Sequence, residues 1–315
     1  MGILRRGDAK GRRGVRKQID AATRSGDLEA VRRLQAERIE REPHDFWPWF
    51  EAGLTAKAQH EWEECARLNA EASARIDTVA AREGFDGSNP GAWNRGIALT
   101  ALGRWQEARQ AWADYGLETG AGEEEIRMDW GTIPIRLNPD QTGLAFAKPP
   151  LDDPDAAIEV VWCARLSPAH VEVVNVPTPE TGHRFGDVLL VDGVPSGERR
   201  LGEETVPVFD ELAVLRRSVQ STSQAVLYAD DVALDALAEE AFARGLGVDD
   251  WSRIRMYCSA CSHGLPDPDH DHPPKVADDA RRVGLGGEVG AVRALLDDWA
   301  AEDGREVVSF EVIWE

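Results

Sequence analysis

The chain has few cysteines and no long hydrophobic run. Only 4 of its 315 residues are cysteine, too few for the disulfide framework that holds small secreted proteins together. No apolar run approaches the roughly 18 residues that a membrane-spanning helix needs. A phosphate-binding G-x-x-x-x-G-K-[ST] motif and a nucleophile motif are also absent. These absences argue against disulfide-stapled and membrane-spanning classes, and we expect a globular, cytoplasmic protein.

Positive charge is scarce outside the first residues. Asp and Glu number 57 against 36 Lys and Arg, which gives a formal net charge of −21. Residues 1–17 carry seven basic side chains and one aspartate, so the rest of the chain is still more acidic. Such a body repels phosphate backbones, and we expect no nucleic-acid partner beyond what a basic arm at 1–11 could contact. This arm has no apolar core after its charges, unlike a secretory signal.

Three stretches of the first 120 residues share one template. Gly26, His60 and Gly103 each precede the second helix of a predicted pair, at intervals of 34 and 43 residues. Corresponding positions then follow in each stretch, namely Leu28, Trp62 and Trp105, then Val31, Cys65 and Ala108, then Gln35, Asn69 and Trp112. A helix-turn-helix period of about 34 residues is typical of a solenoid repeat.

The second and third stretches resemble the tetratricopeptide repeat (TPR). They read W-F-E-A-G-L…H-E-W-E-E-C-A and A-W-N-R-G-I-A-L-T-A-L-G-R-W-Q-E-A, with an aromatic residue, a glycine at a close helix contact (Gly53 and Gly96), and then G-x-W-x-E-A. The resemblance covers residues 12–121. It implies stacked helical hairpins whose groove binds a peptide or a partner helix. The residues that it places on the groove are Phe50, Lys57, Trp93 and Asn94.

The pattern changes after residue 122. Residues 130–215 alternate short apolar runs with proline and glycine turns, which predicts a strand-rich region. Residues 222–315 then read as strand, helix, strand, long loop, helix and strand, an order that favours a ferredoxin-like α+β end. Within it, we interpret GLGGEVG at 284–290 as a flexible entry to the last helix. We therefore predict a basic arm at 1–11, a helical-hairpin solenoid at 12–122 and an α+β domain at 123–315.

A loop rich in cysteine and histidine lies in this last region. It reads Y-C-S-A-C-S-H-G-L-P-D-P-D-H-D-H-P-P, and thiolates and imidazoles are the ligands that tetrahedral zinc prefers. The sequence predicts a structural zinc ion held by Cys258, Cys261, His270 and His272, with His263 as an alternate ligand. Two other interpretations stay open: a C-x-x-C pair with a redox or other metal-free role, and an ordinary polar loop.

A second polar loop joins two predicted strands. It gathers ionisable and amide groups, namely Asn175, Glu180, His183, Arg184 and Asp187. A carboxylate and an imidazole in one loop could transfer a proton. However, no nucleophile or metal motif accompanies them, and its prolines and glycines favour a hairpin connection with a charged tip.

Three classes of function remain from the sequence. We favour a non-catalytic adaptor that binds a peptide or partner helix through the TPR-like groove, and we predict no catalytic residue. The groove could also be filled by the protein's own chain, because a solenoid end needs a cap. The alternatives are an acidic inhibitor or immunity-type protein that masks a basic partner, and a hydrolase-type enzyme that uses the Cys/His loop or the His183 loop.

Overall fold

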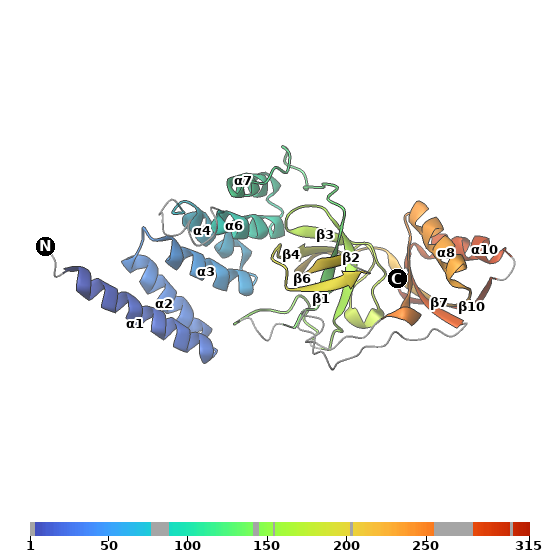
Figure 1. Cartoon of the computed structure of the whole chain (residues 1–315), viewed down its shortest axis with the longest axis horizontal. Helices are drawn as coiled ribbons and strands as arrows, with labels where there is room; N and C mark the ends of the chain where they lie inside the picture. Colours follow the sequence, from blue (N-terminus) through green and yellow to red (C-terminus); the bar gives the residue numbers. More distant parts are fainter. Residues whose placement is uncertain are drawn as a thin grey trace. The chain divides into compact units, whose positions relative to one another are not determined.

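The computed structural model describes residues 4–76, 88–140, 145–153, 155–201, 204–254, 280–302 and 305–315. The chain forms two compact units (Figure 1). The helical unit comprises residues 1–127 with 141–148, and the sheet unit comprises 128–140 with 149–315. The prediction of a helical N-terminal part followed by an α+β part is confirmed.

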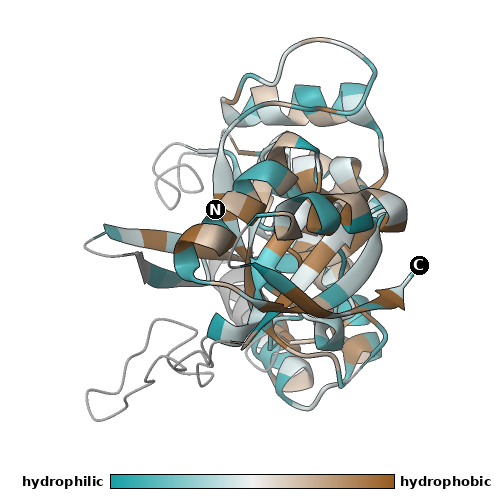
Figure 2. Ribbon diagram, turned by 90° about the vertical axis from the view of Figure 1, so that its right-hand side faces the viewer, coloured by the Kyte–Doolittle hydropathy of each residue, from teal (hydrophilic) through white to brown (hydrophobic). Residues whose placement is uncertain are grey.

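In the described residues of the helical unit, six helices form three hairpins. They are α1 (Leu4–Arg24) with α2 (Leu28–Arg41), α3 (Phe46–Ala58) with α4 (Trp62–Ser73), and α6 (Pro90–Ala101) with α7 (Trp105–Tyr115). Each helix packs against the next one in this order. Hydrophobic and hydrophilic segments alternate along the ribbon (Figure 2), as amphipathic helices require. Among the described residues, no helix combines the length and the apolar character that crossing a bilayer requires.

The three hairpins turn in the same way. Gly26, His60 and Gly103 all have a positive φ, of 73°, 57° and 67°. In each hairpin the residue that follows donates its backbone N–H to the carbonyl five positions earlier: from 27 to 22, from 61 to 56 and from 104 to 99, at 2.9–3.0 Å. This is the left-handed helix stop of a Schellman motif. The template seen in the sequence therefore corresponds to one repeated turn.

The predicted close helix contacts are also present. A Cβ on Gly96 would lie 2.6 Å from the Trp112 ring, and a Cβ on Gly53 would overlap the Asn69 side chain. Asn69 and Trp112 occupy corresponding positions of the sequence template. In both hairpins, glycine on the first helix thus makes room for a large side chain on the second.

The first part of the sheet unit is a closed barrel. Its strands are β1 (Thr132–Leu137), β2 (Glu159–Arg165), β3 (His170–Val173), β4 (Val188–Val191) and β6 (Glu204–Arg216), and β5 (Gly197–Leu201) forms a hairpin with β6. Neighbours are antiparallel, but β1 and β6 pair in parallel and close the barrel. Five strands in an antiparallel meander place the first and last in the same direction, so closure has to be parallel. The sequence predicted strands here but not the barrel.

The second part of the sheet unit runs β7 (Ser221–Tyr228), α8 (Asp231–Ala243), β8 (Gly247–Asp250), β9 (Ala280–Gly287), α10 (Val289–Ala300) and β10 (Glu306–Trp314). Its strand order is β10-β7-β9-β8, with every pairing antiparallel. Residues of α8 and α10 share one buried cluster with strands β7 and β9. Strand β9 was missing from the sequence interpretation.

The interpretation of GLGGEVG as a flexible entry is wrong for its first four residues. Residues 284–287 end strand β9 and are buried. A Cβ on Gly284 would overlap the Trp251 ring, and one on Gly286 would lie 2.5 Å from Cβ of Phe185. Because these glycines have no side chain, the two aromatic rings can pack directly on the face of the sheet. This packing explains why the strand contains several glycines, and a flexible loop is not needed to explain them.

Candidate functional site

The structure brings together two of the four predicted groove residues. Lys57 on α3 donates a hydrogen bond from Nζ to Oδ1 of Asn94 on α6, at 2.8 Å. Asn94 is only 4% exposed, and its Nδ2 donates to the Pro90 carbonyl at 3.2 Å. This pair therefore links two successive hairpins.

The two aromatic groove residues pack into the helical unit. Phe50 is 8% exposed and stacks on Phe46 with ring centroids 5.0 Å apart, so its ring is buried within the helical unit. Trp93 is half-buried against Trp112 at 5.3 Å and Tyr115 at 4.8 Å. Partner binding by the four residues stays a prediction.

A short segment of the chain is docked on the helical unit. Residues 145–148 belong to this unit although they follow strand β1. The backbone N–H of Lys148 donates to the Ala58 carbonyl at 2.9 Å, and Nε2 of Gln59 donates to the Phe146 carbonyl. The Phe146 side chain packs against a cluster formed by α1 and α2. The buried members of that cluster are Val15, Ile19, Ala22, Val31 and Leu34.

The docked segment is held in an uncommon conformation. Phe146 has φ = 63°, a left-handed value that bulky L-residues rarely adopt. Next to it, burial and then the positive charge of Lys148 lower the pKa of His60. The contacts with the helices offset the backbone cost of this conformation.

The predicted zinc ligands Cys258, Cys261, His270 and His272, and the alternate His263, lie outside the described residues. In the parts of the chain that the structure describes, no three His, Cys, Asp or Glu side chains form a group that could hold a metal ion. The zinc site stays a prediction. The other cysteines, Cys65 and Cys163, are buried, and burial raises the pKa of the Cys163 thiol well above its ordinary value.

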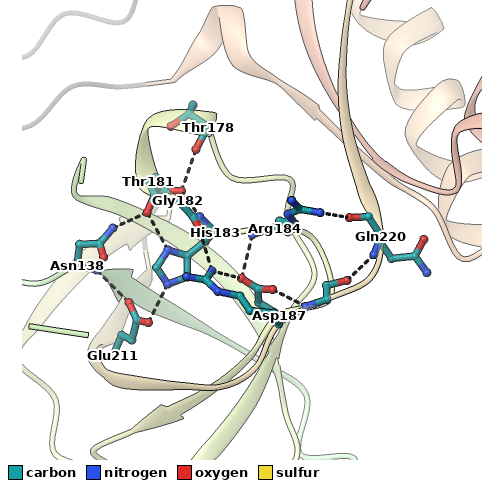
Figure 3. A network of polar contacts seen from close by, with 11 residues as sticks. Asn138, Thr178, Thr181, Gly182, His183, Arg184, Asp187, Glu211 and Gln220 are labelled. Atoms are coloured by element: carbon teal, nitrogen blue, oxygen red, sulfur yellow. Dashed lines mark hydrogen bonds and ion pairs between the residues drawn. The ribbon is translucent and has the colours of Figure 1, made fainter. Parts of the chain in front are cut away.

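The second polar loop is the connection from β3 to β4, and it is not a charged tip. His183 is fully buried in it, next to the short helix η1 (Pro179–Thr181). Its Nε2 lies 2.7 Å from Oε1 of Glu211 on β6, and its Nδ1 lies 2.9 Å from the Thr181 carbonyl (Figure 3). A carbonyl oxygen can only accept, so Nδ1 carries a proton. Both ring nitrogens are therefore occupied.

Burial and the carboxylate act on His183 in opposite directions. Burial lowers the pKa of the imidazole, but the hydrogen bond and charge of Glu211 outweigh it and raise the pKa above 6.5. The carboxylate therefore favours the protonated form of this buried imidazole. Because neither nitrogen can reach a substrate, the geometry gives the enzyme interpretation of this loop no support.

Asn138 completes this network at the end of β1. Its backbone N–H donates to Oε2 of Glu211 at 3.0 Å. Its side-chain Nδ2 donates to the carbonyls of Ala157 and Thr181, at 3.0 and 2.8 Å. Asn138 also has a positive φ of 47°, which asparagine tolerates better than most residues. The network joins two strands and the loop around one buried carboxylate.

Asp187 forms a second buried centre at the other end of the loop. It is fully buried, and its Oδ2 accepts hydrogen bonds from the Arg184 backbone N–H at 3.0 Å and from Arg217 Nη1 at 2.9 Å. Its Oδ1 accepts from the Ser218 N–H at 2.7 Å. One carboxylate thus fixes two segments that carry arginines.

Asn175 joins the barrel to the second sheet. Its Oδ1 accepts from the Trp162 N–H, and its Nδ2 donates to Oδ1 of Asp249 at 2.7 Å. Asp249 also accepts from the Val176 N–H at 2.5 Å. Burial, with a contribution from the negative charge of Glu159, raises the pKa of Asp249 to about 7. A carboxyl group that changes charge near neutral pH therefore lies in this seam.

The sequence predicts the polar loop, but it does not indicate the residues that form hydrogen bonds with the loop. Asn138, Glu211, Arg217 and Asp249 come from distant segments. A usable signal was present for Glu211, because it is a carboxylate inside the apolar run TVPVFDELAVL, and a buried charge needs a partner. Glu180, by contrast, is exposed on η1.

Comparisons of the chain with protein-family models, with curated proteins and with solved structures found no match. The fold is therefore described by its structural parts. These are helical hairpins that share one turn geometry, a closed barrel, and an antiparallel sheet built in the order β-α-β-β-α-β.

Proposed function

We propose that the chain is a non-catalytic binding protein of the cytoplasm, whose helical unit is a short TPR-like array that holds a peptide of a protein partner. The observation that carries this proposal is the docking of residues 145–148. In this contact the helices offer a carbonyl at Ala58, an amide at Gln59 and an apolar cluster to a short segment that turns at Phe146. Such a combination of main-chain bonds and side-chain packing is how peptides are recognised.

The repeat geometry supports the TPR-like assignment. The turns at Gly26, His60 and Gly103 share one left-handed closure, and the glycine contact recurs in two hairpins. The strand order β10-β7-β9-β8 likewise supports a ferredoxin-like end of the sheet unit. The sheet unit supplies no reacting groups to this proposal.

The docked segment and the charge of the chain together suggest the partner's chemistry. The segment presents an aromatic residue, Phe146, and a basic residue, Lys148, two positions later. A net charge of −21 attracts basic segments and steers their association. The proposed partner peptide therefore contains an aromatic residue followed closely by lysine or arginine. An acidic inhibitor of a folded basic protein is the second candidate, and the same charge supports it.

A peptide with the chain's own sequence tests the proposal. The probe is a fluorescently labelled AFAKPP, residues 145–150, and its matched control is AAAKPP. The full-length wild type is compared with a Phe146→Ala/Lys148→Ala variant by fluorescence anisotropy. Because a tethered segment competes at millimolar effective concentration, we expect the variant to bind AFAKPP about tenfold or more tightly than the wild type does.

The outcomes separate the two candidates. Equal affinity for AFAKPP and AAAKPP, or no binding to the variant at any concentration tested, would contradict peptide recognition by this surface. An inhibitor would instead bind a folded basic protein, and its affinity would fall steeply between low and high salt. The peptide contact, which relies on Phe146 burial and main-chain bonds, should lose less affinity over the same range.

The Cys/His loop adds a structural part to the proposal. Four thiolate and imidazole ligands at Cys258, Cys261, His270 and His272 suit a closed zinc site. Elemental analysis of the purified protein should then find about one zinc per chain, lost in a Cys258→Ser/Cys261→Ser variant together with a lower melting temperature. A wild type without zinc would contradict this part and leave the peptide proposal unaffected.

A further inference from the structure

We propose that the sheet unit carries a binding pocket for a small organic oxyanion, a carboxylate or phosphate attached to a flat apolar body. The pocket has a volume of about 320 Å³ and is lined by Gly182, Arg184, Arg217, Ser218 and Trp314. This volume lies at the lower end of the range for small-molecule sites. The proposal is independent of peptide binding by the helical unit.

Three separate segments meet at the pocket. Gly182 and Arg184 come from the loop between β3 and β4, Arg217 and Ser218 directly follow β6, and Trp314 ends β10. Two of the lining residues, Gly182 and Ser218, are small, and two, Arg184 and Arg217, are long and cationic. The pocket therefore depends on the folded sheet unit and is not a feature of one loop.

The fully buried Asp187 positions the pocket. Its carboxylate holds the backbone of Arg184, the guanidinium of Arg217 and the backbone of Ser218, at 3.0, 2.9 and 2.7 Å. Three lining residues are thus fixed from below by one group that the ligand cannot reach (Figure 3 labels Asp187 and Arg184). The backbone at Arg184 and Ser218 and the side chain of Arg217 are thus positioned before a ligand binds.

Charge and donor geometry favour an oxyanion. Two guanidinium groups line the pocket, and the buried Asp187 carboxylate is bonded to one of them, that of Arg217. Arg217 remains 45% exposed. Arg184 uses Nη1 to bond the carbonyls of Gln220 and Glu315. Among the described residues, Nε and Nη2 of both arginines make no hydrogen bond, and such forks match carboxylate and phosphate oxygens.

Trp314 defines the rest of the ligand. The Arg184 guanidinium lies 5.3 Å from the centroid of the Trp314 ring, so the ring both supports the cation and gives the pocket an apolar wall. A flat apolar body can pack on this wall while its oxyanion meets the arginines. The net charge of −21 repels polyanions such as nucleic acids, which favours a small anion as the ligand.

Isothermal titration of the full-length protein tests the pocket with four probes: phenyl phosphate, benzoate, inorganic phosphate and benzyl alcohol. We expect phenyl phosphate and benzoate to bind with a Kd of about 1 mM or tighter. Inorganic phosphate should bind more weakly because it lacks the flat body, and benzyl alcohol should not bind. No binding of either organic anion to the wild type at 10-fold higher concentration would overturn the proposal.

Variants locate the binding. Arg184→Gln should weaken phenyl phosphate about tenfold or more, since it removes a charged donor. Arg282→Gln is the matched control, because Arg282 also lies over a tryptophan, Trp251, at 5.0 Å but outside the pocket; it should leave affinity unchanged. Equal losses in both variants would overturn the assignment. If Arg184→Gln does not fold, the wild-type comparison of benzoate with benzyl alcohol still decides.

A third variant tests the apolar wall. Trp314→Leu should retain inorganic phosphate binding and lose the preference for phenyl phosphate over it. Equal affinity of the wild type for these two probes would contradict the flat-body part of the proposal. Binding of a free peptide to the helical unit predicts none of these results, so the two proposals fail separately.

Discussion

The two units are held together by different kinds of contact. In the helical unit the repeated closures join residues five positions apart, as from Glu61 to Ala56. In the sheet unit the buried polar bonds join distant residues, as from Asn138 to Glu211 or from Asn175 to Asp249. The helical unit is therefore a sum of similar local parts, whereas the barrel and the second sheet depend on a few polar centres.

Removing one polar centre should have the largest effect. Glu211→Ala leaves His183 without its counter-charge and Asn138 without an acceptor, and breaking a buried pair costs about 3–5 kcal/mol. Urea unfolding followed by circular dichroism measures this free energy. The control is Glu198→Ala, an exposed carboxylate on β5, which should change it by less than about 0.5 kcal/mol. Similar values for both variants would contradict the role given to the buried pair.

Overpacking one helix contact should have a smaller effect, confined to the helical unit. Gly96→Val pushes Cβ against the Trp112 ring, and inserting atoms into a packed contact costs about 1–3 kcal/mol. Gly14→Ala is the control, because nothing lies within 4 Å of that Cβ position; it should stabilise α1 by about 0.5–1 kcal/mol. Thermal unfolding at 222 nm checks both. A Gly96→Val protein as stable as the wild type would show that the close contact between position 96 and Trp112 does not contribute to the stability of the helical unit.

The seam at Asp249 should make the sheet unit, but not the helical unit, sensitive to pH. The pKa of Asp249 is about 7 in the folded protein against an ordinary value of 3.8, so the folded state binds more protons between these values. The free energy of unfolding should therefore fall as pH rises through this window, and the loss is complete above about 7.

Asp249→Asn measures that contribution. The variant should lack this part of the pH dependence, with a difference from the wild type of about 2–3 kcal/mol between pH 5 and pH 8. Urea denaturation of both proteins at pH 5 and at pH 8 measures the free energies of unfolding from which this difference is calculated. Identical pH profiles for the two proteins would show that Asp249 is charged at neutral pH in the folded state.

A single turn position should have the smallest effect. Gly103→Ala places a Cβ at φ = 67°, where an L-residue is disfavoured by about 1 kcal/mol. The melting temperature of the helical unit should fall slightly, against a rise for the Gly14→Ala control. A higher melting temperature in both the Gly103→Ala and the Gly14→Ala variants would mean that the turn relaxes to negative φ. The left-handed closure would then not be required for the stability of the hairpin.

The sequence predicted the parts of the fold whose signals are local. The helix pairs follow from the 34-residue template, and helix α8 and the strand that ends at Trp314 follow from amphipathic and alternating patterns. Barrel closure depends on the parallel pair Ile135 and Phe209, which no local pattern indicates. Strand β9 was missed because its glycines, read alone, indicate a loop, while in the fold they accept aromatic rings.

The same distinction applies to the candidate site. His183, Arg184 and Asp187 stood out in the sequence because they are adjacent. Their partners did not, since Glu211 and Arg217 are 28 and 30 residues away from His183 and Asp187. The sequence could not show that His183 is buried with both ring nitrogens hydrogen-bonded, and this is what changes its role from a possible base to a structural group.

The docked segment has a consequence for where the protein can be divided. The chain leaves the helical unit after residue 127, enters β1, returns with residues 141–148 and leaves again at residue 149. Three covalent crossings therefore join the units. A fragment that stops at residue 122 would keep the three helix hairpins described above and lose the segment docked on them. After a single proteolytic cut between 127 and 132, the helices would stay attached to the rest of the chain only through the non-covalent docking of residues 145–148.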